Sequence, residues 1–160
     1  MNRPEYNDKL KTVIKACNTH RERMLFALES LEKIFPVDPD TMKNLSPDQI
    51  SLTDQLIYRF SQLQDTIGNK LFQLIIEGIG EDVRYKPFID ILNRLEKLSI
   101  IDSAEKWLSL REIRNIVTHE YPDNEEEIAD GLNQLFGEAY YLSSILDKLT
   151  EYIKSRKLLE

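Results

Sequence analysis

The stretch that decides the fold lies in the last quarter of the sequence, where residues 128–153 read IADGLNQLFGEAYYLSSILDKLTEYI. Apolar residues recur there at alternating spacings of four and three, which places them on one face of a long helix packed lengthwise on others. This face consists of Ile128, Leu132, Leu135, Ala139, Leu142, Leu146, Leu149 and Ile153. We expect Asp123 or Asn124 to cap the helix, with acidic residues 125–127 at the positive end of its dipole.

The same periodicity predicts four more helices before this segment. Their ranges are about 7–35, 46–78, 87–98 and 102–120. Pro47 suits the first position of the second helix, after Ser46 as its cap, and Gly78 suits its end. Arg21 interrupts the apolar stripe of the first helix, and we expect it to pair with a carboxylate such as Asp65. The sequence predicts one all-α domain over residues 1–160, an up-and-down bundle of four long helices and one short helix.

Composition limits the class of protein. The chain has 160 residues, of which 41% are hydrophobic and 31% charged, so one domain with a single core is expected and intrinsic disorder is excluded. No apolar run reaches the roughly 18 residues that a membrane span requires, and the first residues form no hydrophobic signal segment. The single cysteine, Cys17, cannot form a disulfide within the chain. We therefore expect a soluble cytoplasmic protein that does not contact a membrane.

The charge balance restricts the partners. A net charge of −7 and a pI near 5.0 argue against a protein that binds duplex nucleic acid by neutralising many phosphates. The charge is uneven, because residues 84–119 contain seven basic and five acidic side chains. A local cationic site on an acidic body suits brief contact with single-stranded RNA, or with an acidic partner.

Most catalytic and cofactor-binding motifs are absent from the sequence. The one GxG, at residues 78–80, does not follow a strand, and the sequence contains no phosphate-binding glycine loop, HExxH or CxxC. Cys17 and His20 have the spacing C-x2-H, but two potential ligands without others nearby indicate a core thiol and a helix-flank imidazole rather than a zinc site. We therefore expect neither a metal nor a cofactor.

The stretch with distinctive chemistry is REIRNIVTHEYP, residues 111–122. On a helix, its polar residues Arg111, Arg114, Asn115, Thr118 and His119 occupy one arc and its apolar residues another. Guanidinium groups suit phosphate oxygens and imidazole is a frequent general acid or base, so this arc suits a phosphodiester. A structural role stays open, because arginine stems often cover a bundle core and the helix dipole favours a histidine near a C-terminus.

These residues resemble a known family. Residues 114–119 are similar to the R-x4-6-H signature of HEPN domains, including the polar residue, Asn115, that follows the arginine. With Tyr121 the pattern becomes R-x4-H-x-Y, the form found in HepT-like toxins. The motif also lies at the end of the penultimate predicted helix, as in that family. The resemblance covers the whole chain in architecture and residues 114–121 in motif.

The resemblance implies a metal-independent endoribonuclease in which two subunits place both copies of the motif at one cleft. His119 would act as general acid or base on the ribose 2′-hydroxyl and the leaving oxygen. Arg114 would stabilise the charge that develops on the phosphorane, and Asn115 would orient the phosphate or the histidine. The products would be a 2′,3′-cyclic phosphate and a 5′-hydroxyl. DNA, which lacks the internal nucleophile, would not be cleaved.

For HepT-like toxins the resemblance also implies an MNT-type nucleotidyltransferase antitoxin that adds AMP to the motif tyrosine, here Tyr121. AMP at this position would bring bulk and negative charge to the cleft and repel RNA. Residues 58–60 and 65–70 are similar to the second-helix patterns of nucleotidyltransferase-associated bundles. Arg59, Gln62 and Asn69 lie off the apolar stripe, so we count them with Arg111 and Thr118 as residues that could line the cleft.

Two other functions stay open. Some similar bundles act as non-catalytic companions of a nucleotidyltransferase, which bind its substrate or fix its position, and the acidic net charge suits that role. A plain structural bundle without a site is the second alternative. A buried His119, together with an Arg114 bound to a carboxylate of its own chain, would favour it.

Overall fold

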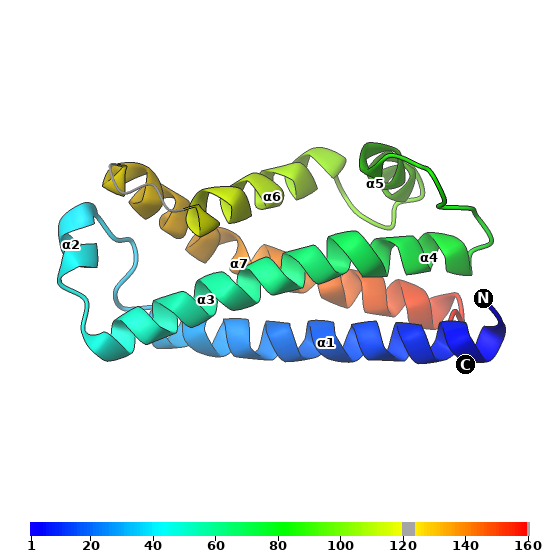
Figure 1. Cartoon of the computed structure of the whole chain (residues 1–160), viewed down its shortest axis with the longest axis horizontal. Helices are drawn as coiled ribbons and strands as arrows, with labels where there is room; N and C mark the ends of the chain where they lie inside the picture. The colour runs from blue at the N-terminus through cyan, green and yellow to red at the C-terminus, as the bar shows by residue number, and fades with distance from the viewer. Residues whose placement is uncertain (120–123, 160) are drawn as a thin grey trace.

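The computed structural model describes residues 1–119 and 124–159 (Figure 1). All regular secondary structure in these ranges is helical, which confirms the all-α class. The elements are α1 (Arg3–Ser30), α2 (Pro39–Lys43), α3 (Pro47–Thr66), η1 (Ile67–Leu71), α4 (Phe72–Gly78), α5 (Phe88–Lys97), α6 (Ala104–Thr118) and α7 (Glu125–Ser155).

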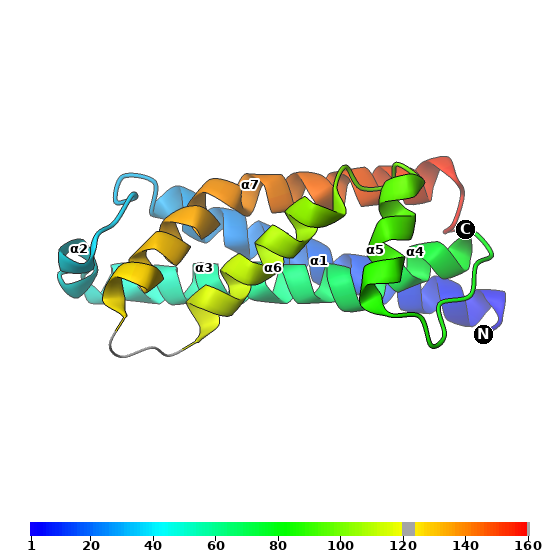
Figure 2. The same ribbon diagram turned by 90° about the horizontal axis from the view of Figure 1, so that it is seen from above.

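Three long helical segments lie side by side along the molecule: α1, the continuous segment α3–η1–α4, and α7. The helix α6 crosses over them obliquely and contacts both α3 and α7, while α5 packs against α4 and α6 (Figure 2). The short α2 lies at the end of the molecule where α1 finishes and α3 begins. This arrangement places the C-terminal end of α6 beside α3.

Polar caps fix the starts of two helices where the sequence predicts them. The Ser46 hydroxyl accepts a hydrogen bond from the Gln49 N–H at 3.2 Å, and the Gln49 side-chain oxygen accepts one from the Ser46 N–H at 2.9 Å. The Ser103 hydroxyl likewise accepts from the Lys106 N–H at 3.1 Å, which starts α6. Each cap satisfies amide groups that have no partner inside the helix.

Other boundaries differ from the prediction. The helix α1 begins at Arg3 rather than near residue 7, because Asn2 and Glu5 form a capping box, and it ends at Ser30 rather than near residue 35. Residues 36–45, between the first two predicted helices, include α2, which is capped by Asp38. The helix α6 has 15 residues and ends at Thr118, so it is shorter than the long helices that we expected.

A π-helical turn, η1, joins α3 to α4 without a break. It contains Gly68, which lies against the indole of Trp107 in α6. A Cβ added at Gly68 would lie 3.1 Å from Trp107 Cζ2, which is tighter than an ordinary contact. The absence of a side chain therefore allows α6 to pack closely on this segment. A π-turn inside a helix often occurs near a functional site.

The core contains the apolar face predicted for α7. Every residue of that face is buried except Ile128, which is partly exposed. Gly131 in α7 packs against Ile116 in α6, so close that an added Cβ would lie 2.6 Å from Ile116 Cγ2. The apolar side chains thus fill the interior between packed helices. Within the part of the chain that the structure describes, no helix has the length and apolar character needed to cross a bilayer.

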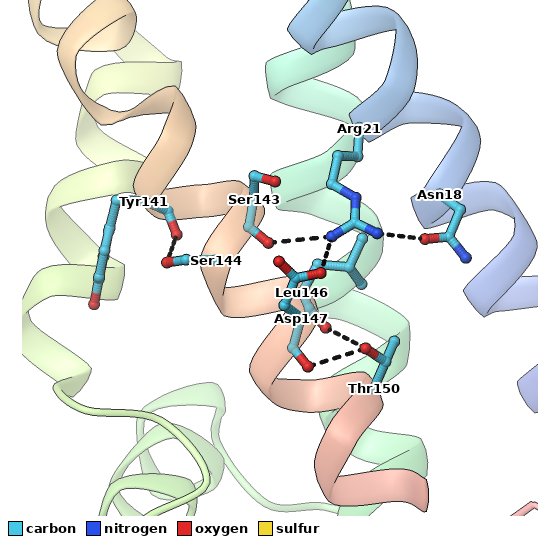
Figure 3. A network of polar contacts seen from close by, with 8 residues as sticks. All are labelled: Asn18, Arg21, Tyr141, Ser143, Ser144, Leu146, Asp147 and Thr150. Carbon is cyan, nitrogen blue, oxygen red and sulfur yellow. Dashed lines mark hydrogen bonds and ion pairs between the residues drawn. The ribbon is translucent and has the colours of Figure 1, made fainter.

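The partner predicted for Arg21 is wrong. Arg21 forms an ion pair with Asp147 of α7, donates to the Asn18 side-chain oxygen at 3.0 Å, and contacts the Ser143 carbonyl oxygen at 3.5 Å (Figure 3). Asp65 is unavailable to it, because Asp65 lies on the side of α3 that faces α6. Arg21 therefore connects α1 to α7 rather than α1 to α3.

Candidate functional site

A surface groove of about 450 Å³ lies where the end of α6 meets α3, and we call it the α3–α6 groove. Its lining comes from the outer side of α3 and from the last turn of α6. The lining residues are Asp54, Ile57, Tyr58, Ser61, Gln62 and Asp65 of α3, followed by Arg114, Val117, Thr118 and His119. Three of the five residues of the predicted polar arc, Arg114, Thr118 and His119, therefore line one groove.

Arg114 is fixed in the groove by two acceptors of its own chain. Its Nη2 donates to Asp65 Oδ2 at 2.7 Å and its Nη1 to Asn115 Oδ1 at 3.1 Å. The side chains of Arg114 and Asp65 are 33% and 31% exposed. Within residues 1–119 and 124–159, the buried Nε of Arg114 has no acceptor. The two Nη atoms carry four hydrogens, so two remain for a further acceptor such as a phosphate oxygen.

His119 lies just beyond the end of α6. Its backbone is extended, with φ −82° and ψ 135°, and its N–H donates to the Asn115 carbonyl at 3.3 Å. The prediction that His119 continues the helical arc is therefore wrong, because the helix ends one residue earlier. The side chain is exposed and still reaches the α3–α6 groove. The observation that would favour a plain bundle is thus only half met, since Arg114 is paired but His119 is not buried.

Two other residues of the arc have structural contacts. The Thr118 hydroxyl lies in the groove and donates to the Arg114 carbonyl at 2.8 Å. Arg111 is not among the residues that line the α3–α6 groove. Its Cζ lies 5.0 Å from the centre of the Phe88 ring, because this part of α6 packs next to α5. Arg111 therefore covers an aromatic ring instead of facing the groove.

Arg59 is not among the residues that line the groove either. Its Nη1 lies 3.0 Å from His20 Nδ1, and its Cζ lies 5.1 Å from the centre of the Tyr58 ring. Burial and the neighbouring Arg59 lower the pKa of His20, which favours the neutral ring. Because arginine only donates hydrogen bonds, Nδ1 accepts and the ring hydrogen is on Nε2. Of the other residues expected at the cleft, Gln62 lines the groove and Asn69 does not.

Sequence reasoning did not assign Asp54 or Tyr58 to this groove, and it did not give Asp65 as the partner of Arg114. Asp54, Tyr58 and Gln62 follow one another at intervals of four, so they form a column on the outer side of α3. The helical projection that separated polar from apolar residues in α6 would have revealed this column in α3. The pairing of Asp65 with Arg114 depends on how two distant segments pack, and a projection of one helix does not contain it.

The remaining predictions concern metal binding and Tyr121. Cys17 is fully buried, and burial raises its pKa to about 12, so it is a protonated core thiol. His20 binds Arg59 instead of a metal partner. No three His, Cys, Asp or Glu side chains among the described residues are placed to bind a metal ion. Tyr121 lies outside the described residues.

Comparisons with known proteins give this site no relative. No protein-family model, no curated protein and no solved structure matches the chain. The function proposed below therefore rests on the groove and on the motif residues that line it.

Proposed function

We propose that this protein is a metal-independent endoribonuclease of the HEPN type, a HepT-like toxin built on an up-and-down helical bundle. One observation carries the proposal. Arg114 and His119, the two defining residues of the motif, line the same solvent-open groove. One offers a cationic donor for a phosphate, and the other offers an imidazole for proton transfer.

The proposed reaction uses the ribose of the substrate as nucleophile. His119 removes the proton of the 2′-hydroxyl, and the 2′-oxygen forms a bond to phosphorus. The bond from phosphorus to the 5′-oxygen then breaks, and that oxygen takes a proton from a general acid. In a homodimer this acid is His119 of the second copy. The products are a 2′,3′-cyclic phosphate and a 5′-hydroxyl.

Arg114 acts on the charge that develops at phosphorus. Its two remaining Nη hydrogens suit phosphate oxygens, and its position is set before substrate arrives by Asp65 and Asn115. Such preorganisation lowers the reorganisation required in the transition state. Asn115 contributes by holding Arg114 through this hydrogen bond.

The partners follow from the same proposal. Two copies pair so that both α3–α6 grooves form one cleft, and an MNT-type nucleotidyltransferase acts as the antitoxin. It inactivates the toxin by adding AMP to Tyr121, whose position in the sequence is two residues after His119. The added negative charge would repel the RNA backbone from the groove.

The test is incubation of wild-type protein and the His119→Ala variant with total RNA in the presence of a chelator, followed by end-group analysis. We expect wild type to produce 2′,3′-cyclic phosphate and 5′-hydroxyl ends. The variant should lose at least about 100-fold in rate with unchanged far-ultraviolet circular dichroism and oligomeric state. Equal cleavage by the variant, or no cleavage by wild type in any oligomeric state, contradicts the proposal.

A second candidate is a non-catalytic companion that positions the substrate of a nucleotidyltransferase. Asp54 favours it, because a carboxylate in the groove opposes the approach of a polyanion. Asp65 is already neutralised by Arg114, so the net opposition comes from Asp54. Wild-type protein that binds the nucleotidyltransferase and leaves RNA intact would select this candidate.

A further inference from the structure

Tyr58 is the large aromatic side chain of the α3–α6 groove. It lies in α3, and 54% of its surface is exposed. Asp54 lies one helical turn before it and Gln62 one turn after it, and all three line the groove together with Arg114. The groove therefore contains a flat aromatic surface between two hydrogen-bonding side chains, next to a cation.

Contacts from inside the molecule hold the Tyr58 ring. The guanidinium of Arg59 lies over the ring, with Cζ 5.1 Å from its centre. Arg59 itself is anchored to His20 of α1, whose Nδ1 lies 3.0 Å from Arg59 Nη1. Because the chain of contacts reaches a second helix, the ring loses little conformational freedom when a ligand stacks on it.

We propose that Tyr58 stacks against an unpaired base of RNA, next to the phosphate that Arg114 binds; this rests on the proposed function. Every nucleobase has a flat face that can stack on an aromatic side chain. In a duplex both faces are covered by neighbouring bases, so only a single-stranded or flipped-out base fits. Asp54 accepts hydrogen bonds and Gln62 accepts and donates them, so both suit the edge of such a base.

The overall charge of the protein agrees with this mode of binding. A net charge of −7 gives little attraction to a polyanion, so affinity must come from contacts that do not depend on charge. Stacking is such a contact. Stacking on Tyr58 also defines the substrate class as unpaired RNA. Duplex RNA of the same sequence should be cleaved poorly.

The experiment measures the binding of RNA to a protein in which the proposed general base is removed, so that the RNA stays intact. In His119→Ala protein, we titrate a short single-stranded RNA that contains 2-aminopurine, whose fluorescence is quenched by stacking, and determine Kd. Tyr58→Ala should weaken binding about 5- to 100-fold and remove the quenching. Tyr58→Phe, which keeps the ring, should bind as the parent does. Tyr140→Ala is the matched control, because Tyr140 is 55% exposed on α7 and does not line the groove.

The outcomes separate this inference from the proposed function. If wild type cleaves RNA and Tyr58→Ala binds and cleaves as well as wild type, the inference is wrong and the nuclease proposal stands. If wild type does not cleave RNA but the parent quenches 2-aminopurine through Tyr58, the nuclease proposal is wrong and the base-stacking site stands. Equal binding of single-stranded and duplex RNA, or equal losses in Tyr58→Ala and Tyr140→Ala, overturns the inference.

Discussion

Two arginine–aspartate pairs in this molecule have the same chemistry and different surroundings. Arg21 of α1 pairs with Asp147 of α7, and Arg114 of α6 pairs with Asp65 of α3. Both connect two helices, and both arginines have a second side-chain oxygen as acceptor, from a residue on the same helix. The first pair bridges α1 and α7 (Figure 3), with the side chains of Arg21 and Asp147 23% and 69% exposed. The second lies in a groove that also contains His119.

The geometry of an ion pair alone therefore does not reveal its role. Surface pairs of this exposure typically stabilise a protein by less than about 1 kcal/mol, and neither pair is needed to explain why the chain folds. What distinguishes Arg114 is what lies beside it: an exposed imidazole and a tyrosine ring in the same groove. Three predictions compare the two pairs and the packing of α6 that positions Arg114.

The largest expected effect is a loss of kcat when Arg114 is replaced but not when Arg21 is replaced. Arg114→Ala removes the donor proposed to stabilise the transition state, so kcat for RNA cleavage should fall about 100- to 1,000-fold. Arg21→Ala removes a comparable pair at a distance from the groove and should leave kcat unchanged. Single-turnover cleavage of a labelled RNA measures both. Equal losses of kcat in Arg114→Ala and Arg21→Ala would mean that both ion pairs act only through the stability of the protein.

The second prediction concerns a substitution that should displace α6, which carries Arg114, and leave α1 and Arg21 in place. In Gly131→Ala the new Cβ would lie 2.6 Å from Ile116 Cγ2, a β-branched side chain that cannot simply rotate away. We expect a loss of about 1–3 kcal/mol in the free energy of unfolding, measured by urea denaturation.

Gly137→Ala is the control on the same helix. Nothing lies within 4 Å of a Cβ added there. Alanine is the better helix former, so this variant should gain roughly 0.5–1 kcal/mol. A destabilised Gly137→Ala, or an unaffected Gly131→Ala, would contradict the close packing of α6 on α7.

The smallest effect concerns the carboxylates. Asp65→Asn keeps an acceptor for Arg114 but removes the charge, so Arg114 should be held less firmly and kcat should fall about tenfold, on the order of 1.4 kcal/mol, without a rise in KM. Asp147→Asn is the matched change and should leave both constants unaltered. A higher kcat in Asp65→Asn would instead show that the carboxylate competes with phosphate for Arg114.

The fold was more predictable from the sequence than the groove, for a physical reason. Ser46 caps α3 as the local sequence indicates, and Asn124 stands at the predicted cap position of α7, without a side-chain cap hydrogen bond. A cap position depends on residues within one turn. The buried face of α7 was likewise evident from its spacing alone. The helix caps and the buried face of α7 both depend on residues that are close together in the sequence.

The groove depends on contacts between distant segments. Asp65 binds Arg114, 49 positions away, and not Arg21, because the packing of α6 on α3 decides which side of α3 faces which helix. His119 was placed on the helix by periodicity, although α6 ends at Thr118. The motif therefore predicts the chemistry of Arg114 and His119. Only the folded structure shows that Asp65 and Tyr58 lie beside them and that all four line one groove.

The π-turn η1 has a consequence for how this protein tolerates changes in length. A π-turn accommodates one residue more than a regular helix, so the faces before and after it differ by about 100° from an uninterrupted α-helix. Deleting one residue between Ile67 and Leu71 removes this extra residue, so regular helix would form while Asp65 and Tyr58 keep their orientation relative to α4. Regular helix in α3 has no extra residue to remove, so the loss of one codon there would rotate the two parts of the helix by about 100° about its axis and redirect the lining of the groove while the helix itself survives.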